Sequence, residues 1–357
     1  MTTTTDSGPA NSESLQLIWQ TFQEANPQAR IRDAAAQLGV SEVELVATSC
    51  GEGVVRLAAD WDQFIHRLEK LGPVMALTRN EHAVSEKYGT FGNIKFNGPM
   101  GLVLNEDIDL RLFIRHWHSG FGVETSGQEG PLRSLQFFDA YGTAIHKVYL
   151  TEASDLVAYN RLIKKFASDD QAQHQSVEPI PAQIPDRPDS TIDIAGLETA
   201  WIGLEDIHDF RDLLQRSGVG RVQALRLVDD ELACRVPTSG LSEVLHMVSQ
   251  YQLAIMVFVG SPGVIQIHSG SVSIVKASGP WINVLDDGFN LHVREDQIAS
   301  AWVVRKPTRD GVVLSLELYD DQGETIALLF AKRKEGQAAS EAWQTVLATL
   351  TSRPCLS

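Results

Sequence analysis

The sequence predicts an α+β fold built from two repeats, each with a large, mainly antiparallel β-sheet flanked by helices. Its 357 residues are enough for about two domains of ordinary size. Three separated stretches of the first half recur in the second, and each half runs from helices through short strand-like segments to a closing helix. Together these observations predict an internal duplication.

The recurring stretches keep their residue types and their order along the chain. They match at offsets of 179, 181 and 181 residues: 32–40 with 211–219, 98–104 with 279–285, and 134–142 with 315–323. Chance rarely gives three matches at so constant a spacing, so we infer that one ancestral unit was copied.

The duplication and the local composition set the predicted boundaries. The N-terminus is polar, and the stretch between the repeats is rich in Gln, Ser, Asp and Pro, which is typical of an extended linker. We expect a disordered N-terminus over 1–13, an N-terminal repeat over 14–166, a linker over 167–195, a C-terminal repeat over 196–351 and a tail over 352–357.

In the first repeat, a helix, a stop at Gly39 and a second helix capped by Ser41 are predicted between residues 30 and 47. Other helices are predicted over 15–23, 60–71 and 155–166. Short runs bounded by turn residues predict strands over 74–78, 90–96, 101–104, 110–114 and 134–138.

The second repeat opens with an apolar pattern that predicts one amphipathic helix, ending at Gly218. The pattern is formed by Leu197, Trp201, Leu204 and Leu214, flanked by Ile207 and Phe210. His208 and Arg211 fall on the same stripe, four and seven residues after Leu204. The histidine is therefore expected to open onto an apolar surface.

A neutral imidazole in such a place is a good ligand for a soft metal or haem iron, and a guanidinium one turn away could bind a carboxylate of the same ligand. On this pattern alone, a hydrogen-bonded core histidine is the commoner role. The first repeat has Ala29 at the position equivalent to His208. This difference favours a single site that is used once per chain.

A second candidate lies in the first repeat, where charged and apolar residues alternate over 109–115. On a strand, Arg111 and Phe113 share one face, and a cation beside an aromatic ring suits a flat anionic ligand. The alternative is an edge strand whose arginines pair with nearby acids. His116 and His118 would also share a strand face, but no third metal ligand stands at recognisable spacing.

Composition excludes several classes of protein. The net charge of −16 opposes a nucleic-acid backbone or an anionic membrane as main partner. The three cysteines, Cys50, Cys234 and Cys355, are far apart and predict neither a disulfide framework nor a zinc site. Neither a signal peptide nor a membrane-spanning run is recognisable, so we expect a cytoplasmic protein. Phosphate-loop, nucleophile-elbow and HExxH motifs are also absent.

From about residue 15 to 350, the chain resembles the bacterial haemin-degrading and haemin-transport proteins of the HemS/ChuS/HmuS/PhuS group. The resemblance rests on Ala-Leu-Thr-Arg-Asn-Glu (76–81), Gly-Pro-Met-Gly-Leu-Val-Leu (98–104), Asp-Leu-Arg-Leu-Phe (109–113), Asp-Ile-His-Asp-Phe (206–210), Gly-Val-Gly-Arg-Val-Gln-Ala-Leu-Arg-Leu (218–227) and Met-Val-Phe-Val-Gly (256–260).

The resemblance implies one haem held between the two repeats, with His208 as proximal iron ligand. By motif it also implies pocket and propionate-binding residues: Arg111, Phe113, Arg221, Phe258, Lys306 and Phe330. Phe330 stands where some members carry a tyrosine, so that hydroxyl is missing. Arg211 stands where some members carry a second histidine, which makes a ligand switch within this helix doubtful.

The function implied is haem binding for uptake, trafficking and iron utilisation in the cytoplasm. The alternative is a haem-degrading enzyme that opens the ring and releases iron with an external reductant. The expected partners are haem, an importer on the cytoplasmic side, and an acceptor haem oxygenase or reductase. Neither nucleic acid nor membrane insertion is expected, and the acidic balance opposes a third role as a haem-responsive regulator that binds nucleic acid.

Overall fold

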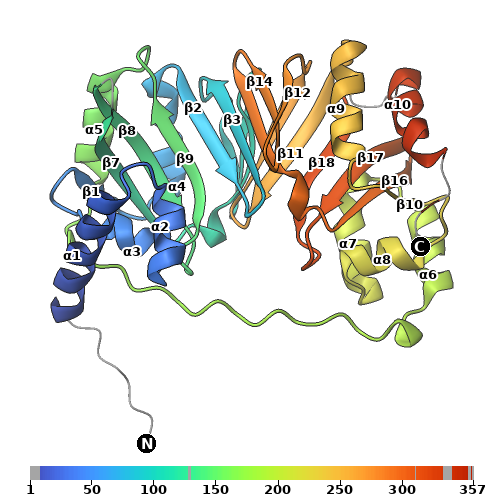
Figure 1. Ribbon diagram of the computed structural model, residues 1–357, viewed down its shortest axis with the longest axis horizontal. Helices are drawn as coiled ribbons and strands as arrows, with labels where there is room; N and C mark the ends of the chain where they lie inside the picture. The colour runs from blue at the N-terminus through green and yellow to red at the C-terminus, as the bar shows by residue number, and fades with distance from the viewer. Residues whose placement is uncertain (1–8, 128–129, 310, 333–339, 353–354, 356–357) are drawn as a thin grey trace, which may run out of the picture. The chain divides into compact units, whose positions relative to one another are not determined.

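The computed structural model describes residues 9–127, 130–309, 311–332, 340–352 and 355 (Figure 1). The chain divides into two compact units. Within the described residues, unit 1 consists of the chain up to Thr78, Tyr88–Pro181 and Ser261–Val264, and unit 2 of Arg79–Lys87, Ala182–Gly260 and Ile265 onward. Each unit thus contains a short segment from the other repeat.

Unit 1 begins with the helices α1 (Pro9–Ala25), α2 (Ile31–Leu38) and α3 (Glu42–Ala47). Gly39 ends α2 at a φ of 69°, a left-handed conformation that glycine adopts without strain. Ser41 and Glu44 form a capping box at the start of α3. The predicted helix–Gly39–helix is confirmed. α1 starts inside the stretch expected to be disordered, of which residues 1–8 lie outside the described residues.

The main sheet of unit 1 is antiparallel, in the order β1-β7-β8-β9-β2. Its strands are β1 (Val54–Arg56), β7 (Ser119–Gly127), β8 (Gly130–Phe138), β9 (Ala144–Leu150) and β2 (Val74–Arg79). A smaller antiparallel set consists of β4 (Lys95–Asn97), β5 (Met100–Leu104) and β6 (Asp109–Phe113).

Two helical segments pack directly on this sheet: α4 (Trp61–Ile65), which η1 (Leu68–Leu71) follows, and α5 (Leu156–Phe166). A Cβ at Gly122 of β7 would come within 2.3 Å of Ile163, and one at Gly120 within 2.7 Å of Trp61. Only glycine allows helices so close to the strand. Aromatic rings such as those of Phe64 and Phe137 pack with aliphatic side chains in the core behind them.

Unit 2 repeats this plan. Its main antiparallel sheet has the order β10-β16-β17-β18-β11. The strands are β10 (Ala233–Val236), β16 (Ser300–Thr308), β17 (Gly311–Tyr319), β18 (Thr325–Ala331) and β11 (Ile255–Ser261). β12 (Val264–Gly270) follows, then β13 (Val275–Ser278), β14 (Trp281–Asp286) and β15 (Phe289–Arg294), and β15 pairs with β3 (Ala83–Gly89) of the first repeat.

The pairing registers confirm the duplication. Ser315 stands opposite Phe330, and 181 residues earlier Ser134 stands opposite Tyr149. A register shift follows in the same place in both repeats, at Phe137/Phe138 and at Leu318/Tyr319. Since a slip by one residue would exchange the faces of a strand, equal registers mean equal faces. Equivalent positions can therefore be compared directly.

The two faces of the main sheet in unit 2 pack against different helices. One face forms an apolar core with α9 (Gly240–Gln250) and α10 (Glu341–Thr351), in which Leu316, Val244 and Trp343 are buried (Figure 1). The other face carries α6 (Ile194–Ile202), α7 (Phe210–Ser217) and α8 (Arg221–Leu227) at one end. All the candidate residues of this unit lie with the second face.

Three predicted elements are wrong in extent. The single helix ending at Gly218 is divided into α6, the 3-10 turn η4 (Ile207–Asp209) and α7, because α6 ends at Gly203 and Asp206 starts a new turn. The helix over 60–71 is divided into α4 and η1. The strand predicted over 90–96 forms only at its end, in β4. The strand β3 was not predicted.

Cysteine spacing gave the wrong expectation. Cys234 on β10 and Cys355 form a disulfide, with Cα atoms 5.4 Å apart and 121 residues between them in sequence. Folding brings together cysteines that no local motif connects. Cys50 is free and buried.

The stretch between the repeats has no helix or strand until η3 (Asp189–Thr191), but its two ends pack on different units. In unit 1, Arg56 donates to the carbonyls of Ala172 and His174 at 2.9 and 2.6 Å. In unit 2, Gln183 donates to the carbonyl of Gln322 at 2.9 Å. Among the described residues, no helix is long and apolar enough to cross a membrane.

The disulfide should stabilise unit 2. Replacing Cys355 by Ser removes a link that closes a loop of more than a hundred residues, so we expect a loss of about 2–4 kcal/mol in the free energy of unfolding. Hydrogen exchange followed by mass spectrometry should show faster exchange in β10 and α10 and no change in β8. The free-thiol variant Cys50→Ala is the control. Unchanged exchange in β10 would contradict this role.

A buried histidine should make unit 1 sensitive to acid. Burial lowers the pKa of His146 to about 3, and its Nδ1 lies 2.8 Å from the Thr78 hydroxyl. In the unfolded chain this pKa is near 6.5, so between pH 6.5 and 4 the unfolded state takes up a proton that the folded state does not. Roughly 3 kcal/mol of stability should be lost over that range.

The variant His146→Leu should reduce this dependence, as measured by urea unfolding of unit 1 at pH 7, 5.5 and 4. The control is His246→Gln on the exposed side of α9. An equally steep loss in His146→Leu would show that other groups cause the acid sensitivity.

Candidate functional site

The seven predicted residues are distributed over the two units. Unit 2 contains five of them, and unit 1 contains Arg111 and Phe113. Those of unit 2 come from separate elements: His208 from η4, Arg221 from α8, Phe258 from β11, Lys306 from β16 and Phe330 from β18.

His208 lies in an exposed turn. Asp206 accepts a hydrogen bond from the His208 backbone N–H at 2.9 Å, and its carboxylate also lies 2.7 Å from the ring Nδ1. The side chain of His208 is 88% exposed. The expectation that it opens onto an apolar stripe is therefore wrong, because the turn at η4 rotates it away from the buried side of α7. With Nδ1 engaged, Nε2 is the nitrogen suited to a ligand.

The turn is tightly connected to α7. The Asp209 N–H donates to the Asp206 carbonyl at 3.1 Å, and the Phe210 N–H donates to the Ile207 carbonyl. Phe210, the first residue of α7, is 3% exposed and packs edge-on against Trp201 at 4.4 Å. An exposed histidine is thus attached to a buried aromatic anchor two residues later.

Arg221 and Lys306 meet at a buried carboxylate that sequence reasoning missed. Glu317 on β17 is fully buried and accepts hydrogen bonds from four side chains. The donors are Arg221 at 3.2 and 2.9 Å, Lys306 at 2.5 Å, Ser315 at 2.8 Å and Tyr319 at 2.5 Å. The only signal in the sequence was an acid within a strand that is otherwise largely apolar.

The cluster is electrostatically coupled. Burial alone would raise the pKa of Glu317, but Arg221 and Lys306 hold it well below its usual range. Burial lowers the pKa of Lys306 to about 8, and Glu317 opposes part of that shift. At pH 7 the cluster therefore has two positive groups and one negative group. Lys306 is 1% exposed, whereas the side chain of Arg221 is 30% exposed.

Phe258 and Phe330 lie on the same face of the sheet as this cluster. Glu317 stands opposite Leu328, and Leu328 stands opposite Phe258, so the three side chains share a face. The rings of Phe258 and Phe330 are 5.0 Å apart at 65° and half-buried. They form an aromatic pair on this face. The equivalent of Phe330 in the first repeat is Tyr149, by register.

In unit 1, Arg111 pairs with a nearby acid, which is one part of the alternative interpretation. Its guanidinium forms an ion pair with Asp109 two residues earlier on β6. Phe113 is half-buried, and its N–H donates to the Gly263 carbonyl at 2.9 Å. A role for Arg111 in ligand binding would require its guanidinium to leave or share Asp109.

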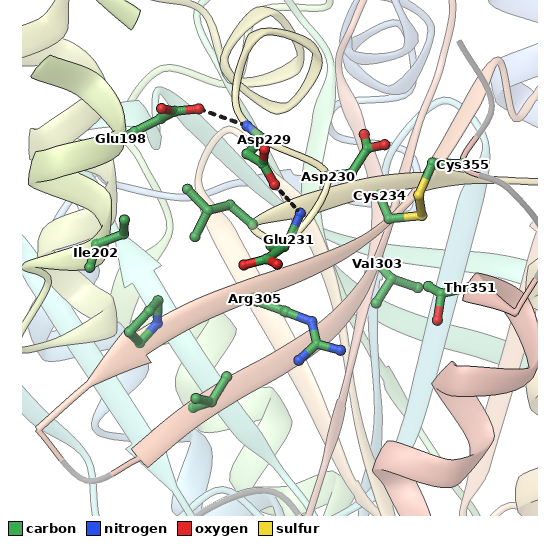
Figure 2. A pocket seen from close by; sticks show the side chains of 13 residues that line it. Glu198, Ile202, Asp229, Asp230, Glu231, Cys234, Val303, Arg305, Thr351 and Cys355 are labelled. Carbon is green, nitrogen blue, oxygen red and sulfur yellow. Dashed lines mark hydrogen bonds between the residues drawn. A yellow bond between two sulfur atoms is a disulfide. The ribbon is translucent and has the colours of Figure 1, made fainter. Parts of the chain in front are cut away.

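A cavity of about 890 Å³ in unit 2 contains none of the predicted residues (Figure 2). Figure 2 shows its wall of carboxylates beside the Cys234–Cys355 disulfide, with one guanidinium; these are Glu198, Asp229, Asp230, Glu231 and Arg305. From β16 it is lined by Val303 and Arg305, which alternate with Lys306 and so point to the other face. Its negative charge would repel an anionic ligand.

Comparisons with known proteins identify the family of this chain. A family model described as the haemin-degrading HemS/ChuX domain matches residues 39–166 and 218–350. The hemin transport protein HmuS of Yersinia pestis is 38% identical over 329 residues, which cover 92% of this chain and 94% of that protein.

Two solved structures share the fold over nearly the whole chain. Holo-PhuS, a heme-binding protein from Pseudomonas aeruginosa, superposes with a TM-score of 0.93 at 41% identity and covers 97% of this chain and 99% of that one. ChuS, an E. coli heme oxygenase, superposes with a TM-score of 0.85 at 37% identity, covering 94% and 99%. The duplicated domain, the identity and the coverage show that the chain belongs to the haemin-degrading HemS/ChuX family.

Proposed function

We propose that the protein binds haem and carries it within the cytoplasm for iron utilisation. The observation that carries this proposal is the exposed His208, whose Nδ1 is held by Asp206. A histidine ligand of a metal commonly donates its second ring nitrogen to a carboxylate, which fixes the tautomer and increases ligand basicity. The names of relatives from Yersinia and Pseudomonas support the same function.

The neighbouring residues fit the other parts of haem. It is a flat apolar disc with two carboxylates, so its site needs aromatic walls and a few cations. We infer that Phe258 and Phe330 provide a wall and that the partly exposed Arg221 provides a cation. Lys306 is buried behind it and adds positive charge without a direct contact. We keep Arg111 and Phe113 as proposed contacts from unit 1.

A second candidate function is haem degradation, because the similar ChuS is described as a heme oxygenase. Bound haem would then supply the iron chemistry on its own ring. The chain would have to leave the side opposite His208 open to oxygen and accept electrons from an external reductase. A carrier needs only the ligand residue and the walls.

The partners follow from either function. We propose that an importer on the cytoplasmic side supplies the haem, and that an acceptor haem oxygenase or a reductase acts after binding. The cavity lined by four carboxylates lies on the other face of β16 and is not part of this proposal.

The variant His208→Ala should separate ligation from folding. Because the side chain is 88% exposed, its loss should change the free energy of unfolding by less than about 0.5 kcal/mol. Haem affinity should fall at least about tenfold and the Soret band should move, because the iron loses its protein ligand. Gln215→Ala, an exposed change on α7, is the matched control. A Soret band of wild-type position and affinity in His208→Ala would remove this ligand assignment.

One absorbance experiment distinguishes carrier from enzyme. The protein is titrated with haem, and a reductant is then added under air with catalase present. A stable Soret band that passes to an added acceptor protein supports the carrier. Loss of the band despite catalase, with free iron and an open-chain tetrapyrrole recovered, supports the enzyme. The absence of any Soret shift on titration would contradict both.

A further inference from the structure

Glu317 is a buried charge with an unusually complete set of partners. Five hydrogen bonds from Arg221, Lys306, Ser315 and Tyr319 reach its two oxygens, and none of its surface is exposed. A buried carboxylate is tolerated when its lone pairs accept hydrogen bonds. If the carboxylate loses its charge, the cations beside it lose the partner that holds them in place. Its position therefore determines where the two cations lie.

Both cations lie over one aromatic ring. The ammonium of Lys306 is 4.6 Å from the centre of the Phe210 ring, and the guanidinium carbon of Arg221 is 5.4 Å from it. These distances are within the range of cation–π attraction, which is strongest where water is excluded. Phe210 is 3% exposed and has Trp201 on another side. Its ring is held from the sheet by Lys306 and from α8 by Arg221.

Phe210 is also the first residue after the turn that carries His208. The N–H of Phe210 closes η4 through the Ile207 carbonyl, and the Asp209 N–H bonds to the Asp206 carbonyl. A displacement of Phe210 must move or loosen this short turn. The side chain of His208 is 88% exposed, and its hydrogen bonds to Asp206 lie within the same turn, so its position follows that of the turn.

We propose that Glu317 is a positioning residue: by holding Lys306 and Arg221 against Phe210, it fixes the turn that presents His208. The effect of this inference on haem binding rests on the proposed function. Its structural part, the order of the turn, applies to the protein without haem. Glu317 touches no ligand and acts through the cations and the ring.

The first repeat provides an internal comparison. Its sheet has the same register, but the position equivalent to Glu317 is Gln136, and the position equivalent to Phe258 is Leu77. Its buried Lys147, which stands opposite Gln136, pairs one-to-one with Glu42 instead. This repeat also lacks the histidine, with Ala29 in its place. The carboxylate with two cations thus occurs in the repeat that carries His208.

The test uses Glu317→Gln in the full-length protein without haem. The carboxamide keeps the size of the side chain, but its NH2 end cannot accept from the donors around it. Hydrogen exchange of the amides from His208 to Asp212 should become about tenfold faster, while β16, β17 and β18 stay protected. The matched control is Glu42→Gln, which makes the same change in a buried ion pair of unit 1 and should leave this exchange unchanged.

Phe210→Leu tests the same link from the ring, because it removes the cation–π contacts and leaves Glu317 and its donors in place. Phe210→Leu should accelerate the exchange of the same amides. If Glu317→Gln also loses protection in β16, β17 and β18, the result for Phe210→Leu decides whether the proposal holds. Wild-type exchange from His208 to Asp212 in Phe210→Leu, or in a folded Glu317→Gln, would overturn the proposal. An equal acceleration of these amides in the control Glu42→Gln would also overturn it.

Haem then gives an independent readout. In Glu317→Gln, haem should dissociate about tenfold faster, and the Soret band should show a mixed population of ligated and unligated iron. Haem dissociation and a Soret band like those of the wild type would contradict the positioning role. If the wild type itself fails to bind haem, the proposed function is wrong, and the exchange of the turn still decides the role of Glu317.

Discussion

The arrangement of the second unit depends on burying one carboxylate. Glu317 is fully buried in the sheet, where an unpaired charge would cost several kcal/mol. Its partners come from α8, β16 and β17, so the ion cluster joins a helix to two strands. The apolar contacts of Phe210 and Trp201 then close over the cations. A buried charge thus adds directional contacts to the apolar packing between these elements.

The duplication shows how one sheet can acquire a function in only one copy. The two repeats share strand order, register and even the site of a register shift. What differs is the polar content of one face. In the first repeat Glu42 pairs with Lys147, so this pair adds no net charge to the face. In the second, Arg221 and Lys306 exceed Glu317 by one positive charge, and Arg221 is the one that solvent reaches.

Local signals explain what the sequence could predict. Gly39 and Ser41 act within one turn of the chain, so the helices around them were predicted correctly. The duplication and its offsets are also visible in the residues alone. The exposure of His208 could not be predicted from the sequence. The helical pattern continues past Gly203, and only the capping by Asp206 shows that the helix is interrupted.

Long-range partners could not be predicted from spacing. Arg221 and Glu317 are 96 residues apart, and Cys234 and Cys355 are 121 apart, so folding alone identifies them as pairs. The family resemblance named Arg221 and Lys306 but gave no sign of the carboxylate between them. For Arg111 the sequence left two interpretations open, and the ion pair with Asp109 agrees with the structural one.

The negative charge of the whole chain makes the positive cluster of Arg221 and Lys306 important for an anionic ligand. A net charge of −16 repels a ligand with two carboxylates, and the carboxylate-lined cavity behind β16 adds to that repulsion. A single excess positive charge, with an exposed histidine nearby, can overcome it only locally. Such a site holds its ligand by few interactions, each of which can be broken separately. For the proposed carrier this is an advantage, because a protein that must pass haem to an acceptor needs a path for release as well as for binding.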